Sequence, residues 1–148
     1  MSNREVDVLP PALDCARLLY YAVLDRTIKF SGRTLLFVDG EELGAVPCLA
    51  ICEDQHPPGF LLFHCTSDWR VLGCSAHESV SESRDRAERI YSGVSARWVD
   101  ANVSPEAADV FLNKLFKGQR CSRCGKRPDE VNSLTQEGAR WTCSECAQ

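Results

Sequence analysis

The chain has 148 residues, of which 44% are hydrophobic and 26% charged, and its formal net charge is −4. These values are typical of a globular domain with room for a small appendage. The acidic balance disfavours a general nucleic-acid binder, and no apolar run reaches the roughly 18 residues of a membrane span. Because the polar N-terminus lacks the apolar region of a signal peptide, we expect a cytoplasmic protein.

The first predicted element is a helix. Pro10 and Pro11 suit a first helical turn, and apolar residues recur at helical spacing through about Leu24. The members of this stripe are Ala12, Ala16, Leu19, Tyr20 and Val23. Cys15 lies among them, and we expect it to pack as a small hydrophobic residue.

The middle of the chain predicts β-structure. Four short apolar runs are separated by turn residues, and Asp39-Gly40 is a strong signal for a tight turn. Pro47 indicates an edge or a bulge early in the second run. The short connections favour an antiparallel meander with helices on one face. The four runs cover residues 33–38, 45–52, 60–65 and 69–74.

Further along, the sequence predicts a helix with a capping box of Ser79 and Glu82, a fifth strand, and a last helix that begins at Pro105. These elements cover residues 79–92, 94–100 and 105–117. The whole pattern predicts an α+β fold with a mainly antiparallel sheet of four to five strands and about three helices. We expect a body over residues 1–118 and a small zinc hairpin over residues 119–148.

The C-terminal segment carries two Cys-x2-Cys pairs, Cys121 with Cys124 and Cys143 with Cys146. Their separation of about 18 residues is typical of a structural zinc site, in which four thiolates surround one ion tetrahedrally. Redox Cys-x2-Cys motifs usually occur singly at the start of a helix. A closed set of four cysteines leaves no open coordination position, so the predicted Zn²⁺ is structural and not catalytic.

Other residues of the segment fit a zinc hairpin. Gly125 follows the first cysteine pair, where a positive φ is needed, and Gly138 suits the hairpin tip. We expect the side chains of Val131, Leu134 and Trp141 to cover one face of the site.

Several residues that are not ligands accompany the cysteines: Ser122, Gly125, Lys126, Asp129, Glu130, Val131, Leu134, Gly138 and Glu145. With them the segment resembles the N-terminal zinc-binding module of ClpX, a bacterial AAA+ unfoldase that feeds a protease. The resemblance implies a module that dimerises and captures adaptors and substrates without chemistry of its own. Arg123 stands where that family usually carries an aromatic residue. The chain has no Gly-x4-Gly-Lys-Ser/Thr motif, so the resemblance implies a protein-binding module and not an ATPase.

The leading hypothesis is therefore a non-enzymatic, bacterial-type protein-interaction or adaptor module, with a protein partner or a second copy of the chain. A small cysteine- or metal-dependent enzyme is one alternative, and no catalytic residue is assigned. A second metal could be held by Cys48, Cys52 and His56, or by His64, Cys65, Cys74 and His77. A cysteine nucleophile could be Cys65 or Cys74 with His77 and Asp68.

A nucleic-acid-binding zinc protein is the other alternative. Basic residues beside an aromatic side chain can grip a single strand, and the C-terminal segment offers such a group near Trp141. Its members are Arg120, Arg123, Lys126, Arg127 and Arg140. The acidic residues in the same segment oppose this alternative, and a steep dependence of binding on salt would identify it.

Overall fold

The computed structural model describes residues 9–54, 58–131, 134–138 and 140–146. The chain forms two compact units, Met1–Ser104 and Pro105–Gln148. The described residues contain two α-helices, one in each unit, and most of the remaining regular structure is β-sheet. The α+β class is thus confirmed, with fewer helices than predicted.

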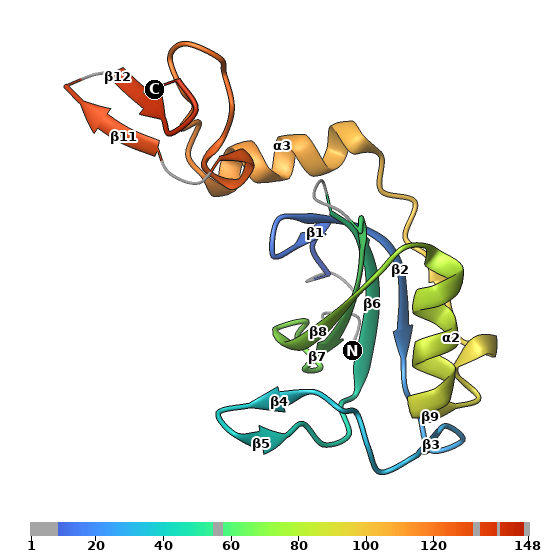
Figure 1. Cartoon of the computed structure of the whole chain (residues 1–148). Coiled ribbons are helices and arrows are strands. Elements are labelled where there is room, and N and C mark those ends of the chain that lie inside the picture. Colours follow the sequence, from blue (N-terminus) through green and yellow to red (C-terminus); the bar gives the residue numbers. More distant parts are fainter. Residues whose placement is uncertain (1–8, 55–57, 132–133, 139, 147–148) are drawn as a thin grey trace. The chain divides into compact units, whose positions relative to one another are not determined.

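The first unit is built on a curled antiparallel sheet of six strands (Figure 1). The strand order is β1-β2-β6-β7-β8, and β10 also pairs with β2. The strands are β1 (Ala12–Leu13), β2 (Ala16–Val23), β6 (Cys48–Glu53), β7 (Phe60–Cys65), β8 (Val71–His77) and β10 (Val99–Asp100). Strands β6, β7 and β8 form three of the four strands of the predicted antiparallel meander. The first predicted run, residues 33–38, lies outside this sheet, and its last two residues pair instead with Glu41–Glu42.

Both faces of the sheet are covered, and for this reason β6 is apolar along almost its whole length. Residues Cys48–Cys52 are all buried. One face carries a cluster that includes Leu18, Cys48, Ala50, Cys52, Phe63 and Cys65. The opposite face packs Leu49, Ile51 and Leu62 against Ala87 and Ile90 of α2 (Val80–Ile90).

The predicted N-terminal helix is wrong, because this segment forms the hairpin of β1 and β2. Its two-residue turn is Asp14-Cys15, and both residues have positive φ, at 45° and 67°. A β-bulge then shifts the register between Leu18 and Tyr20. A bulge inserts one extra residue and breaks the alternation of buried and exposed positions, which is why the apolar spacing imitates that of a helix.

The remaining elements of the first unit are short. Asp39 and Gly40 form the predicted tight turn, with φ of 53° and 83°. Ser79 caps α2 by accepting a hydrogen bond from the Glu82 N–H at 3.0 Å. Residues 94–100 were predicted as one strand, but Val94–Ala96 form a 3₁₀ helix and only Val99–Asp100 (β10) are a strand. The elements are β3 (Lys29–Phe30) paired with β9 (Tyr91–Ser92), β4 (Phe37–Val38) paired with β5 (Glu41–Glu42), and η1 (Val94–Ala96).

The second unit contains α3 and the cysteine-rich segment. Its elements are α3 (Pro105–Leu115), η2 (Pro128–Glu130), β11 (Leu134–Glu137) and β12 (Arg140–Cys143). Strands β11 and β12 pair as the predicted antiparallel hairpin. Ala108 and Leu112 of α3 are buried as predicted, whereas Leu115 is 55% exposed.

Candidate metal centre

The four C-terminal cysteines converge on one point. The Sγ atoms of Cys121, Cys124, Cys143 and Cys146 all lie within 4.8 Å of one another. The Sγ atoms of Cys124 and Cys143 are 3.7 Å apart. A tetrahedron of sulfurs with metal–sulfur bonds near 2.3 Å has edges of about 3.8 Å, whereas a disulfide needs about 2.05 Å. The four cysteines are therefore positioned to bind one metal ion.

The first cysteine pair lies in a tight loop closed by backbone hydrogen bonds. The Cys121 N–H donates to the Lys126 carbonyl at 2.9 Å, and the Gly125 N–H donates to the Cys121 carbonyl at 2.9 Å. Gly125 has a φ of 77°, which favours glycine as the sequence predicted. The loop brings the two thiols of the pair together.

The second pair reaches the first from the end of the hairpin, since Cys143 is the last residue of β12. Three backbone N–H groups point at sulfur atoms, each at 3.4 Å. Arg123 and Cys143 donate to the Sγ of Cys121, and Cys146 donates to the Sγ of Cys143. Such hydrogen bonds orient metal ligands and stabilise their ionised form.

The electrostatics of the cluster favour a bound cation. The N–H groups of Cys124, Cys143 and Arg123 lower the pKa of the Cys121 thiol to about 6. Hydrogen bonds with the thiols of Cys143 and Cys124 raise the pKa of Cys146 to about 12. Four sulfurs this close cannot all ionise side by side without a compensating positive charge, and a divalent ion supplies it. An all-sulfur donor set suits a soft or borderline metal.

Two arginines connect the cysteine loops to α3. The guanidinium of Arg127 is 7% exposed and donates to Asp129 at 3.0 Å and to Asp109 of α3. Arg120 donates to the Gly125 carbonyl at 2.8 Å and to Asn113 of α3. From the sequence, both arginines are expected only as members of the basic group that a nucleic acid would contact. No local pattern marks their partners on α3, because Arg127 and Asp109 are 18 positions apart.

Two further basic side chains of the predicted cluster also have partners within the second unit. Arg123 donates to the Cys146 carbonyl at 2.8 Å, and Lys126 forms an ion pair with Glu145 at 2.7 Å. Of the residues predicted to cover the site, Val131 and Trp141 are half-buried. The side chain of Leu134 lies outside the described part of the structure.

Among the described residues, the members of the alternative metal and nucleophile sets do not come together. Because Cys65 pairs with Cys48 across β6 and β7, and Cys74 pairs with Phe63, both thiols lie on the face opposite to His64. His77 contacts Ser75 at 2.7 Å and Glu82 at 3.2 Å instead. Within the described residues, the clustering of potential metal ligands is confined to the four C-terminal cysteines.

Burial also raises the pKa of both candidate nucleophiles, Cys65 and Cys74, which disfavours their thiolate forms. Burial raises the pKa of Cys65 to about 12 and that of Cys48 to about 11. The carboxylate of Asp68 accepts a hydrogen bond from Thr66, whereas the ring of His77 contacts Ser75 and Glu82. His56 lies outside the described residues.

Comparisons with protein-family models, with curated proteins and with solved structures find no match to this chain. The resemblance to the ClpX module therefore rests on the residues of the C-terminal segment alone. No helix among the described residues combines the length and the apolar character needed to cross a membrane.

Proposed function

We propose that the protein is a non-enzymatic, zinc-stabilised protein-interaction module, with one structural Zn²⁺ held by Cys121, Cys124, Cys143 and Cys146. The convergence of four thiols within 4.8 Å carries the proposal. Zinc takes four thiolates in a closed tetrahedron, which leaves no position for water or substrate. The ion then holds the hairpin in shape and performs no chemistry.

Two observations support a protein partner over a nucleic acid. Four basic side chains already form hydrogen bonds or ion pairs within their own unit, so a phosphate would have to replace these partners. They are Arg120, Arg123, Lys126 and Arg127. On α3, Val110 is 64% and Leu115 is 55% exposed. These two side chains give α3 exposed apolar surface for contact with another protein. The resemblance to the ClpX module points to an adaptor, a substrate or a second copy of the chain as that partner.

The metal assignment is tested by native mass spectrometry of the purified, reduced protein. We expect one Zn²⁺ per chain in the wild type and a loss of the ion in Cys143→Ser and in Cys121→Ser. Cys74→Ser is the matched control, because Cys74 is an exposed cysteine outside the cluster. Full zinc occupancy in both ligand variants would show that the assignment is wrong.

The partner assignment is tested by zinc-loaded protein as bait in a cell lysate, followed by reconstitution with the purified candidate partner. We expect a complex that persists from 50 to 500 mM salt, as apolar contacts predict, and weakens at least ~10-fold in Val110→Asp. Val38→Asp is the control, since Val38 is an exposed valine of the first unit. Recovery of nucleic acid alone, with binding that falls steeply with salt, would overturn the proposal.

A further inference from the structure

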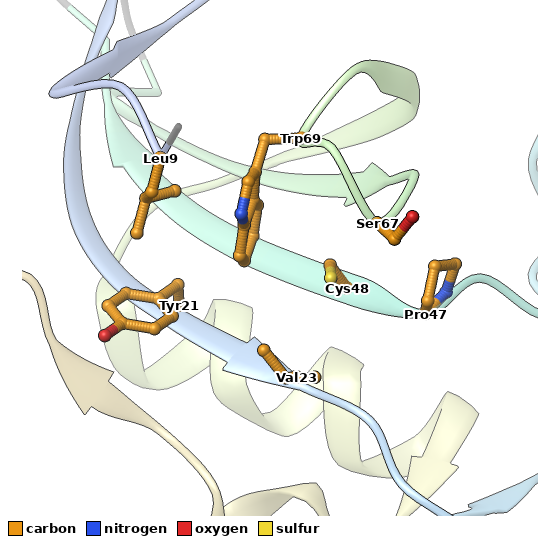
Figure 2. Close-up of a pocket in the computed structure, with 7 residues that line it drawn as sticks. All are labelled: Leu9, Tyr21, Val23, Pro47, Cys48, Ser67 and Trp69. Atoms are coloured by element: carbon orange, nitrogen blue, oxygen red, sulfur yellow. The ribbon is translucent and has the colours of Figure 1, made fainter. Parts of the chain in front are cut away.

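An apolar pocket lies in the first unit, far in sequence from the cysteine cluster. Its volume is about 150 Å³, and its walls include Leu9, Tyr21, Val23, Pro47, Cys48 and Trp69. Figure 2 shows the Trp69 indole reaching from the β7–β8 connection toward β2 and β6, with Cys48 and Pro47 to one side of it. The pocket is thus assembled from four separate stretches of the chain.

The backbone conformation of Trp69 and the contacts of its indole fix this side chain in the wall of the pocket. Trp69 has a φ of 67°, which is strained for a bulky side chain and persists only where the surroundings impose it. The turn that holds it is closed by three hydrogen bonds near 3.0 Å, in which Thr66 accepts from Trp69 and from Arg70 and donates to Arg70. The indole is 6% exposed and meets the Tyr21 ring edge-to-face, with centroids 5.7 Å apart. Strain of this kind often accompanies a ligand site.

The chemistry of the walls restricts the ligand. Almost all of the surface lining the pocket belongs to apolar atoms, and no charged residue contributes to it. Burial raises the pKa of the Cys48 thiol to about 11, so this wall is uncharged at neutral pH. A charged group would lose its hydration here without gaining a partner. The ligand must therefore be uncharged where it enters the pocket.

The size of the pocket restricts the ligand further. Apolar cavities of about 150 Å³ admit benzene-sized molecules, while pockets for larger ligands begin at roughly 300 Å³. Val23 borders the opening and is 56% exposed, so the interior is accessible from solvent. We propose that this pocket binds a small uncharged molecule with a single aromatic ring or an equally compact branched aliphatic group. The site is separate from the proposed zinc module and does not depend on it.

The probe is toluene, added to the full-length, zinc-loaded protein and followed by ¹H–¹⁵N correlation spectra. We expect saturable shifts at the amides of Val23, Cys48 and Trp69, with a dissociation constant of about 1 mM or tighter, a value within reach of a ligand this small. Benzoate, which has the same ring and a charge, should cause no saturable shift.

The matched variants are Val23→Phe, which fills the opening, and Val38→Phe, which makes the same change on an exposed strand position elsewhere. Toluene affinity should fall at least ~10-fold in the first and stay unchanged in the second. If Val23→Phe does not give a folded spectrum, Ser67→Phe tests the same opening from an exposed loop position. Shifts that do not saturate, shifts centred elsewhere, equal binding of benzoate, or unchanged affinity in the folded pocket variant would each overturn the proposal.

Discussion

His64 is a buried histidine inside the first unit. Its side chain has no exposed surface, and neither ring nitrogen has a hydrogen-bond partner among the described residues. The nearest ring is that of Tyr91, with centroids 6.2 Å apart. Burial, together with the positive charge of Arg86, lowers the pKa of His64 to about 4. The folded protein therefore holds this imidazole neutral at pH 7.

This residue makes the stability of the first unit depend on pH. In the unfolded chain the pKa of histidine is about 6.5, so between pH 6.5 and pH 4 the unfolded state binds more protons than the folded state. The stabilisation is fully present above pH 6.5 and is lost as the pH falls toward 4, by up to about 1.4 kcal/mol per pH unit. Urea unfolding at several pH values, read from amide signals of β6 and β7, measures this slope.

The variant His64→Phe should flatten the slope, because it removes the group that takes up the proton and keeps a ring of similar size. His77→Gln is the comparison variant, because the His77 ring contacts Ser75 and Glu82, whereas the His64 ring has no hydrogen-bond partner among the described residues. If His64→Phe retained the wild-type pH dependence, another group would have to account for it.

At the scale of elements, Arg127 connects α3 to the cysteine loops. Its guanidinium bonds to Asp109 of α3 and to Asp129, and the side chain of Asp129 is only 3% exposed. Removing one member of a buried ion pair costs about 3 kcal/mol or more. We predict that Arg127→Ala lowers the free energy of unfolding of the second unit by an amount of this order.

Hydrogen exchange of the α3 amides measures the effect, and protection should fall in Arg127→Ala while the amides of β6 and β7 stay protected. Arg140→Ala is the control, because Arg140 is exposed at the start of β12. Arg127→Lys should recover only part of the loss, since an ammonium group cannot form the paired contacts of a guanidinium. Unchanged protection of α3 in Arg127→Ala would mean that the ion pairs do not hold the helix.

At the scale of the whole molecule, the two units should differ in what stabilises them. The first unit has two buried apolar clusters, one on each face of its sheet. Among its described residues the second unit has few buried side chains, so metal binding would supply much of its folding free energy. We predict that a chelator at pH 7 unfolds residues 105–148 and leaves the first unit folded.

Circular dichroism and amide spectra recorded with and without the chelator test this prediction. With the chelator, the amide signals of the second unit should move to random-coil positions. The same should happen in Cys143→Ser without chelator. Excess Zn²⁺ should restore the folded signals of the chelated wild-type protein. Simultaneous loss of all signals would contradict the prediction, because it would mean that the units fold as one.

The sequence by itself determined the elements whose signals are local. Strand β7 covers the predicted residues 60–65, the Asp39-Gly40 turn joins β4 and β5, and Ser79 caps α2. The four cysteines belong to the same group, since the spacing within each pair and the hairpin between them bring the thiols together. The turn and the cap join groups that are close in sequence. The two cysteine pairs are 19 positions apart, but their residue type and spacing form a metal-ligand pattern that the sequence shows directly.

Only the tertiary structure decided the features that depend on distant contacts. Strands β1 and β10 have two residues each, too few for a recognisable pattern, and they exist because β2 supplies their partners. The Asp14-Cys15 turn lacks the glycine that usually marks such a turn, and the bulge in β2 conceals the alternation of a strand. The pairing of Arg127 with Asp109 and the apolar pocket beside Trp69 likewise depend on how separate segments meet, which no single stretch of sequence specifies.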